Sequence, residues 1–187
     1  MQWAAAVCVG ACVGLSACAM APPTEVGARD DQFRPYREVE TAAYSPSVYP
    51  GIMHIRLAGH IDRQTGAVTT LFKVKHSYVG QHRHNYEIAR NAKAEQLKLT
   101  VIARYGNCRV RTDCPLDELY TIEVPEADLR AAGAQGYRYK VFPRVGPENL
   151  ITVPPETVAA FLALLDKEKR GPATASITPT AAARKTP

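Results

Sequence analysis

This chain lacks the common catalytic motifs. It contains no G-x-S-x-G or H-E-x-x-H sequence and no glycine-rich phosphate loop. Each of these motifs needs its residues at a fixed spacing, because a nucleophile, a metal or a phosphate must be held by several groups at once. Asp117 and Glu118 are adjacent, so in a strand they point to opposite faces and do not form a carboxylate pair. The sequence therefore predicts no catalytic residues, and we interpret the protein as non-enzymatic.

Long apolar runs and cysteine are also scarce. Residues 3–15 carry no charge and are almost all small or apolar. A helix that crosses the bilayer core needs about 20 apolar residues, so this stretch is too short. It is typical of the apolar part of a signal peptide. Of the five cysteines, only Cys18, Cys108 and Cys114 follow it.

The residues Leu15-Ser16-Ala17-Cys18 directly follow the apolar stretch and resemble a lipobox, the processing signal of bacterial lipoproteins. The resemblance implies that residues 1–17 are a signal peptide and that Cys18 carries fatty acyl chains such as palmitate. Two or more chains hold a protein on a membrane, because each buried CH₂ contributes about 0.8 kcal/mol. The resemblance also implies a place in the cell envelope on the periplasmic side. Ala19, where Asp tends to retain relatives at the inner membrane, favours the outer membrane. The alternative is an ordinary secretory signal cleaved elsewhere, for instance after Ala21.

An exported protein folds in an oxidising compartment, where an even pair of cysteines forms a disulfide by default. Cys108 and Cys114 are that pair, with five residues between them. A redox-active pair usually has two intervening residues and a helix N-terminus, and neither is indicated here. We therefore expect a structural disulfide that stabilises the fold by roughly 2 kcal/mol.

Composition divides the mature chain into three parts. Residues 18–50 are rich in proline and charge without a sustained apolar period, which predicts a tether between the lipid and the folded domain. Residues 51–170 carry the alternating patterns of a mostly β domain, and residues 171–187, rich in Ala, Thr and Pro, predict a disordered tail. In outline, the cysteine spacing, the strand–Pro–helix ending and the tail resemble small uncharacterised lipoproteins of proteobacteria, a resemblance that implies no activity or binding residues.

Period-2 alternation predicts six or seven antiparallel strands. The clearest are residues 53–61 and 67–79, joined by a hairpin at 62–66, followed by 97–104, 120–124, 137–142 and 150–153. Two short helices are expected after Pro125 and after Pro155, the second with an apolar stripe of Val158, Phe161, Leu162 and Leu165. We predict an antiparallel β-sandwich with two short helices. The alternative is an α+β fold in which the C-terminal helix covers one sheet.

The five histidines all lie between residues 54 and 84. His54 and His60 share one face of a strand, and His82 and His84 form an H-x-H step, so all four would converge on Zn²⁺ or Cu²⁺ if the hairpin brought the two pairs together. Against this, solvated histidines are common in basic loops, and His76 falls on an apolar face, where a hydrogen-bonded core residue is expected. No other cofactor is predicted.

The net charge of +5 is concentrated in the middle of the chain. Nine Lys or Arg and two acidic residues lie between Lys73 and Arg111, and a basic surface of this kind attracts anionic headgroups or polyanions. The acidic residues that follow would instead compensate this charge in the fold. We hypothesise a lipid-anchored envelope protein that binds another protein or an envelope glycan through its sheet edge or basic face. The alternative is a periplasmic metal-binding lipoprotein, and no nucleic acid partner is expected.

Overall fold

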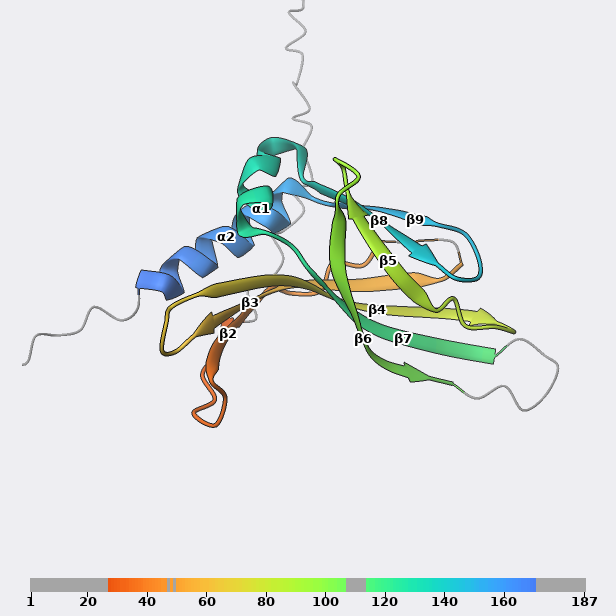
Figure 1. The fold of residues 1–187 in the computed structure, drawn as a ribbon, viewed down its shortest axis with the longest axis horizontal. Helices are drawn as coiled ribbons and strands as arrows, with labels where there is room; N and C mark the ends of the chain where they lie inside the picture. The colour runs from red at the N-terminus through yellow and green to blue at the C-terminus, as the bar shows by residue number, and fades with distance from the viewer. Residues whose placement is uncertain (1–26, 47, 49, 107–113, 171–187) are drawn as a thin grey trace, which may run out of the picture.

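The strands of this chain form one antiparallel sheet, and the helices pack beside it (Figure 1). The computed structural model describes residues 27–46, 48, 50–106 and 114–170. Within these ranges the strands are β1 (Gly27–Arg29), β2 (Tyr36–Glu40), β3 (Ile52–Asp62), β4 (Val68–Gly80), β5 (Tyr86–Asn91), β6 (Gln96–Tyr105), β7 (Cys114–Glu123), β8 (Tyr137–Pro143) and β9 (Asn149–Val153). The helices are α1 (Glu126–Ala132), the 3₁₀ turn η1 (Gly133–Gln135) and α2 (Pro155–Arg170).

The sheet has the order β1-β2-β3-β4-β7-β6-β5-β8-β9, and every neighbouring pair is antiparallel. It curls into a half-barrel, in which β5, β8 and β9 fold back over β4 and β7 (Figure 1). Aromatic contacts cross the resulting interior. The ring centroids of Phe72 on β4 and Tyr139 on β8 are 4.9 Å apart, and those of Tyr86 on β5 and Tyr120 on β7 are 5.0 Å apart. The core therefore lies between the two halves of one sheet.

The prediction of a mostly β, antiparallel fold with two helices is confirmed, but the sandwich of six or seven strands is not what forms. The described residues contain nine strands in a single sheet. Alternation reports only that each strand has one buried face and one wetter face. A single curled sheet satisfies that pattern as well as two separate sheets do, so the pattern alone does not distinguish them. The alternative, with the C-terminal helix against one sheet, is closer to the structure.

Three strands are absent from the sequence prediction. β1 and β2 lie within residues 18–50, so part of the predicted tether belongs to the sheet. β2 escapes the pattern because its buried positions include the charged residues Glu38 and Glu40. Alternation does not reveal β5, because the pairing of β5 with β8 shifts register between Tyr86 and Ile88 and so interrupts the period of two.

The core is apolar and is closed on one side by α2. The predicted stripe of this helix is confirmed, since Val158, Phe161 and Leu165 are buried and Leu162 packs partly buried against them. Gly59 on β3 lets the helix approach closely, because a Cβ atom there would lie 3.0 Å from Cδ1 of Leu165. Both helices thus lie on the core side of the sheet, and the opposite face of β3 and β4 is left open. In the part of the chain described here, no helix is both long and apolar enough to span a membrane.

Candidate ligand-binding groove

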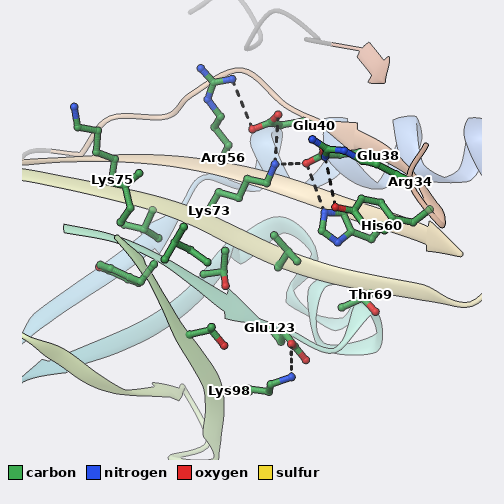
Figure 2. Close-up of a pocket in the computed structure, with 18 of the residues that line it drawn as sticks. Arg34, Glu38, Glu40, Arg56, His60, Thr69, Lys73, Lys75, Lys98 and Glu123 are labelled. Atoms are coloured by element: carbon green, nitrogen blue, oxygen red, sulfur yellow. Dashed lines mark hydrogen bonds and ion pairs between the residues drawn. The ribbon is translucent and has the colours of Figure 1, made fainter. Parts of the chain in front are cut away.

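The open face of the sheet is hollowed into a groove of about 1080 Å³ that crosses β2, β3, β4, β7 and β6 (Figure 2). Drug-sized ligands usually occupy pockets of roughly 300–1,000 Å³. The groove is the side-chain surface opposite the core, so its residues are those that alternation assigns to the wetter face. The side chains on its β2, β3 and β4 side are mainly Glu38, Glu40, His54, Arg56, His60, Thr69, Leu71, Lys73 and Lys75. Those on its β7 and β6 side are Leu119, Thr121, Glu123, Lys98, Thr100 and Ile102.

The β7 and β6 side of the groove is mixed, with the apolar side chains Leu119 and Ile102 at one end and the Lys98–Glu123 ion pair at the other. Leu119 and Thr121 alternate along β7, and Thr100 lies directly opposite Thr121 in the pairing with β6. The register between β6 and β7 then skips Ile102, which marks a β-bulge between Val101 and Ala103. A bulge re-aims side chains, and Ile102 lines the groove with 61% of its surface exposed.

The β2 end of the groove holds two buried carboxylates. Glu38 and Glu40 are two residues apart on β2 and therefore share a face. Lys73 on β4 forms ion pairs with both of them (Figure 2). Arg34 pairs with Glu38 at 3.2 Å, and Arg56 pairs with Glu40 at 3.7 Å. Buried carboxylates persist only when paired and hydrogen-bonded, and these partners meet that requirement.

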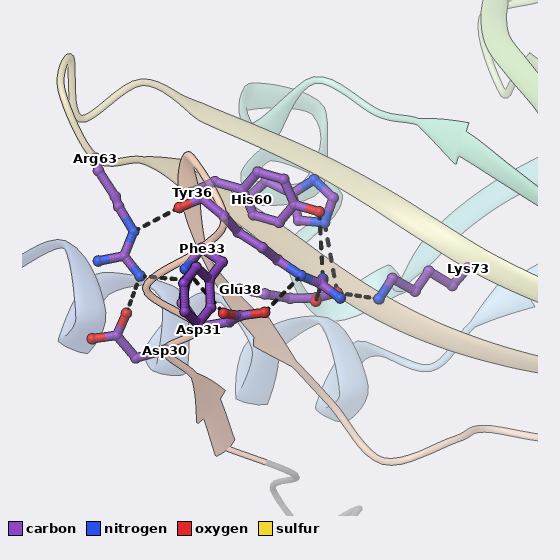
Figure 3. A network of polar contacts seen from close by, with 9 residues as sticks. Asp30, Asp31, Phe33, Tyr36, Glu38, His60, Arg63 and Lys73 are labelled. Atoms are coloured by element: carbon purple, nitrogen blue, oxygen red, sulfur yellow. Dashed lines mark hydrogen bonds and ion pairs between the residues drawn. The ribbon is translucent and has the colours of Figure 1, made fainter.

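His60 completes this network on β3. Its Nε2 lies 3.6 Å from Oε1 of Glu38, and its ring stacks on Tyr36 with the centroids 4.1 Å apart (Figure 3). Burial lowers the pKa of His60 below its ordinary value, although Glu38 acts in the opposite direction. Burial by itself would raise the pKa of Glu38, but hydrogen bonding and attraction to Lys73 outweigh it and leave that pKa lowered. At neutral pH, Glu38 is therefore ionised and His60 is uncharged.

A second network fixes the segment that leads into β2. Arg63, just after β3, donates hydrogen bonds to the carbonyl oxygens of Asp31 and Arg34, both at 3.0 Å, and pairs with Asp30 (Figure 3). The loop between β1 and β2 is thereby tied to the β3–β4 hairpin. This anchoring holds β2 and its two glutamates against the groove.

The charges in the groove are layered. The side chains of Glu38 and Glu40 are only 4% and 6% exposed, whereas that of Lys73, which pairs with both, is 34% exposed. Arg34 and Arg56 are more exposed still. The carboxylates thus lie beneath the cations that neutralise them. A molecule that enters the groove from solvent meets the positive groups first.

The four histidines predicted as metal ligands are not brought together. His54 and His60 line the groove, where His54 Nδ1 lies 2.8 Å from the Ser45 hydroxyl. His84 is buried and stacks on Tyr78 of the core face, with ring centroids 4.2 Å apart, and His82 lies at a separate hollow of about 420 Å³. Among residues 27–46, 48, 50–106 and 114–170, no group of three or more metal-binding side chains is found. Metal binding by these histidines remains a prediction, and their positions in the described residues do not support it.

The predicted lipidation and disulfide sites remain predictions. Cys18 and Cys108 lie outside the described residues, and Cys114 begins β7. The expectation that His76 is a hydrogen-bonded core residue is confirmed, since it is fully buried and its Nε2 lies 2.7 Å from the carbonyl oxygen of Pro50.

Sequence reasoning missed the residues that define the groove. Glu38 and Glu40 lay in a segment interpreted as a tether, and the bulge at Ile102 depends on pairing with a distant strand. One signal was available: Tyr-Arg-Glu-Val-Glu at 36–40 alternates weakly, with Tyr36, Glu38 and Glu40 on one face. Chemically, a groove that combines apolar side chains such as Leu119 and Ile102 with a layer of exposed cations is suited to binding. No family model, no curated protein and no solved structure matches this chain.

Proposed function

We propose that this protein is a lipid-anchored component of the cell envelope that binds an envelope molecule in the open-face groove without transforming it. The anchor is the acylated Cys18 implied by the lipobox resemblance. The groove is the observation that carries the binding role, because its volume and its combination of apolar and charged side chains are those of sites that hold a ligand. The outer membrane is the proposed location, with the domain on the periplasmic side.

The rigidity of the groove supports a binding role. Its charged side chains are held by ion pairs, such as Lys98 to Glu123 at 2.7 Å within the groove and Lys75 to Asp117 at 3.1 Å beside it. A preformed site binds with less loss of conformational freedom than a flexible one. The core side of the same sheet is filled by apolar side chains, so the open face is the surface that β3 and β4 present to a ligand.

Site-specific photo-crosslinking in cells tests this proposal. A photoreactive amino acid replaces Thr100, which is exposed in the groove on β6, and in a matched control it replaces Thr152, which is exposed on β9 outside the groove. We expect the Thr100 variant to capture a discrete envelope species that the Thr152 variant does not capture. The Lys75→Met substitution in the Thr100 variant should reduce that capture. Equal capture at both positions, or none at either, would contradict the proposed function.

A further inference from the structure

We infer that the groove binds an anionic lipid, with the charged headgroup over β3 and β4 and the acyl chain over β7 and β6. This inference rests on the proposed function and names its ligand. Its basis is the strand register, which places Leu119 and Ile102 across the groove from the cations on β3 and β4, while the charged residues of β6 and β7, Lys98 and Glu123, pair with each other at the far end.

The cationic half is defined by two cross-strand pairs. Arg56 on β3 lies directly opposite Lys73 on β4, and His54 lies directly opposite Lys75. All four side chains line the groove. Basic side chains directly opposite one another in an antiparallel sheet are destabilising when both are charged. The Arg56–Lys73 pair is such a case, and Glu38 and Glu40, buried beneath it, offset the repulsion from below. Both cations keep side-chain surface exposed, 42% for Arg56 and 34% for Lys73, so an anion bound above the pair can contact them from the solvent side.

The other half, whose apolar side chains are Leu119 and Ile102, continues the same rows across the sheet. Lys73 is opposite Thr121 on β7, and Thr121 is opposite Thr100 on β6. Lys75 is opposite Leu119, and Ile102 bulges from β6 next to it. Neighbouring strands are about 4.8 Å apart, so the apolar side chains on β6 lie roughly 10 Å from the cations on β4. A ligand that satisfies both halves has an anionic group joined to an apolar chain.

The location of the groove favours a lipid over a peptide. An extended peptide gains affinity by hydrogen bonding to an open strand edge. The groove lies on a sheet face, where β3, β4 and β7 are each paired on both sides and their backbone groups are occupied. A ligand there is held by side chains alone, through apolar contact and charge. An acyl chain with a phosphate or carboxylate headgroup uses both.

Calorimetric titration of the purified full chain with three probes tests this inference. The probes are dodecyl phosphate, dodecyltrimethylammonium and inorganic phosphate, each below its micelle concentration where one applies. We expect saturable binding of one dodecyl phosphate and no saturable binding of the other two. Equal binding of the cationic amphiphile would overturn the role of the cations, and equal binding of inorganic phosphate would overturn the role of the chain.

Two variant pairs place the ligand in the groove. Lys75→Met should weaken dodecyl phosphate binding about tenfold, the loss expected for one charge-assisted contact. Its control is Lys93→Met, which also removes an exposed ion pair, to Asp128, away from the groove. Ile102→Ser should weaken binding by a similar factor of about ten through lost apolar contact. Leu150→Ser, at a comparably exposed residue on β9, should leave it unchanged.

The two proposals fail in different ways. If dodecyl phosphate does not bind but the Thr100 cross-linker captures a protein or glycan in cells, the groove is a binding site and the lipid assignment is wrong. If dodecyl phosphate binds but loses nothing in the Lys75 and Ile102 variants, the lipid lies elsewhere and the inference is also wrong. If neither experiment detects a ligand, both the lipid inference and the proposed function are wrong.

Discussion

The hydroxyl of Tyr78 donates a 2.6 Å hydrogen bond to Oε1 of Glu118, a carboxylate that is only 1% exposed to solvent. The same oxygen accepts the backbone N–H of His84 at 2.8 Å and that of Asn85 at 3.1 Å. Asn85 adopts a φ of 55°, in the left-handed region that few residues favour. One buried carboxylate therefore holds the turn between β4 and β5, where the curled sheet begins its second half.

Replacing Glu118 should destabilise the fold strongly. Glu118→Ala leaves the Tyr78 hydroxyl and the Asn85 N–H without their acceptor, takes one of two acceptors from the His84 N–H and removes the ion-pair partner of Arg104, so we expect a loss of about 3–5 kcal/mol in the free energy of unfolding. Glu118→Gln keeps one oxygen in place and should cost less. Urea denaturation of the two variants measures this difference. Equal losses would show that the hydrogen bonds to the carboxylate do not organise the turn.

Acid should destabilise the protein through His76. Its Nε2 lies 2.7 Å from the carbonyl oxygen of Pro50 and must donate, so in the neutral ring its Nδ1 is the acceptor for the Tyr86 hydroxyl at 2.9 Å. Burial lowers the pKa of His76 from 6.5 to about 4. The unfolded chain therefore takes up a proton first. The contribution of neutral His76 to the free energy of unfolding is fully present above pH 6.5. It falls by about 3 kcal/mol as the pH drops to about 4.

The measurement is the free energy of unfolding between pH 4 and pH 7, for the native chain and for His76→Gln. The variant should be less stable at pH 7 but should lose less stability on acidification. His60 and His84, whose pKa values are also lowered, mainly by burial, act in the same direction and leave a residual slope. Parallel pH profiles of the two proteins would rule out His76 as the main titrating group.

The close contact of α2 with β3 predicts a coupled pair of substitutions. A Cβ at Gly59 would lie 2.8 Å from Cγ2 of Val39 and 3.0 Å from Cδ1 of Leu165. Gly59→Ala should therefore cost about 1–3 kcal/mol through overpacking. Leu165→Ala should cost about 2–5 kcal/mol through the cavity it leaves. In the double variant the new methyl group partly fills that cavity, so the combined loss should be smaller than the sum. Simple additivity in thermal or urea unfolding would refute the contact.

The parts of this fold that could be predicted from the sequence are those with a local, periodic pattern of apolar residues. β3 and β4 follow from strict alternation on either side of the Asp62–Gly66 turn, where Asp62 accepts the backbone N–H of Thr65 at 2.7 Å. α2 follows from Pro155 and its apolar stripe. The hairpin pairs strands that are neighbours in sequence, and the helix buries one continuous face. A period of two or of 3.6 residues is therefore enough to find these elements.

The parts that sequence could not predict depend on distant pairing or on buried charge. β7 inserts between β4 and β6, and the Arg56–Lys73–Thr121–Thr100 row exists only because of that order. Glu38 and Glu40 are buried because basic residues from other segments cover them, and a glutamate in isolation indicates solvent exposure. The four histidines failed as a cluster for a related reason, because His84 turns into the core while His54 and His60 stay on the open face.

The proposed lipid anchor predicts metabolic labelling at one residue. Cells that express the chain with its own N-terminus are grown with a palmitate analogue, and the protein should carry the label on Cys18. Cys18→Ser should abolish the label and release the protein from the membrane fraction, since two or more acyl chains supply the attachment. Label retained in the Cys18→Ser variant would show that the lipobox resemblance misleads.

The central claim is that the open face of the sheet is where this protein meets its ligand. Methyl NMR of the purified chain, titrated with a total extract of envelope lipids and glycans, tests it most directly. The account predicts that the methyl resonances of Leu71, Leu119 and Ile102 shift together and saturate, while those of Leu150 on β9 and of the core residue Leu57 stay in place. Shifts confined to Leu150 or the core, with the groove methyls unmoved, would contradict it.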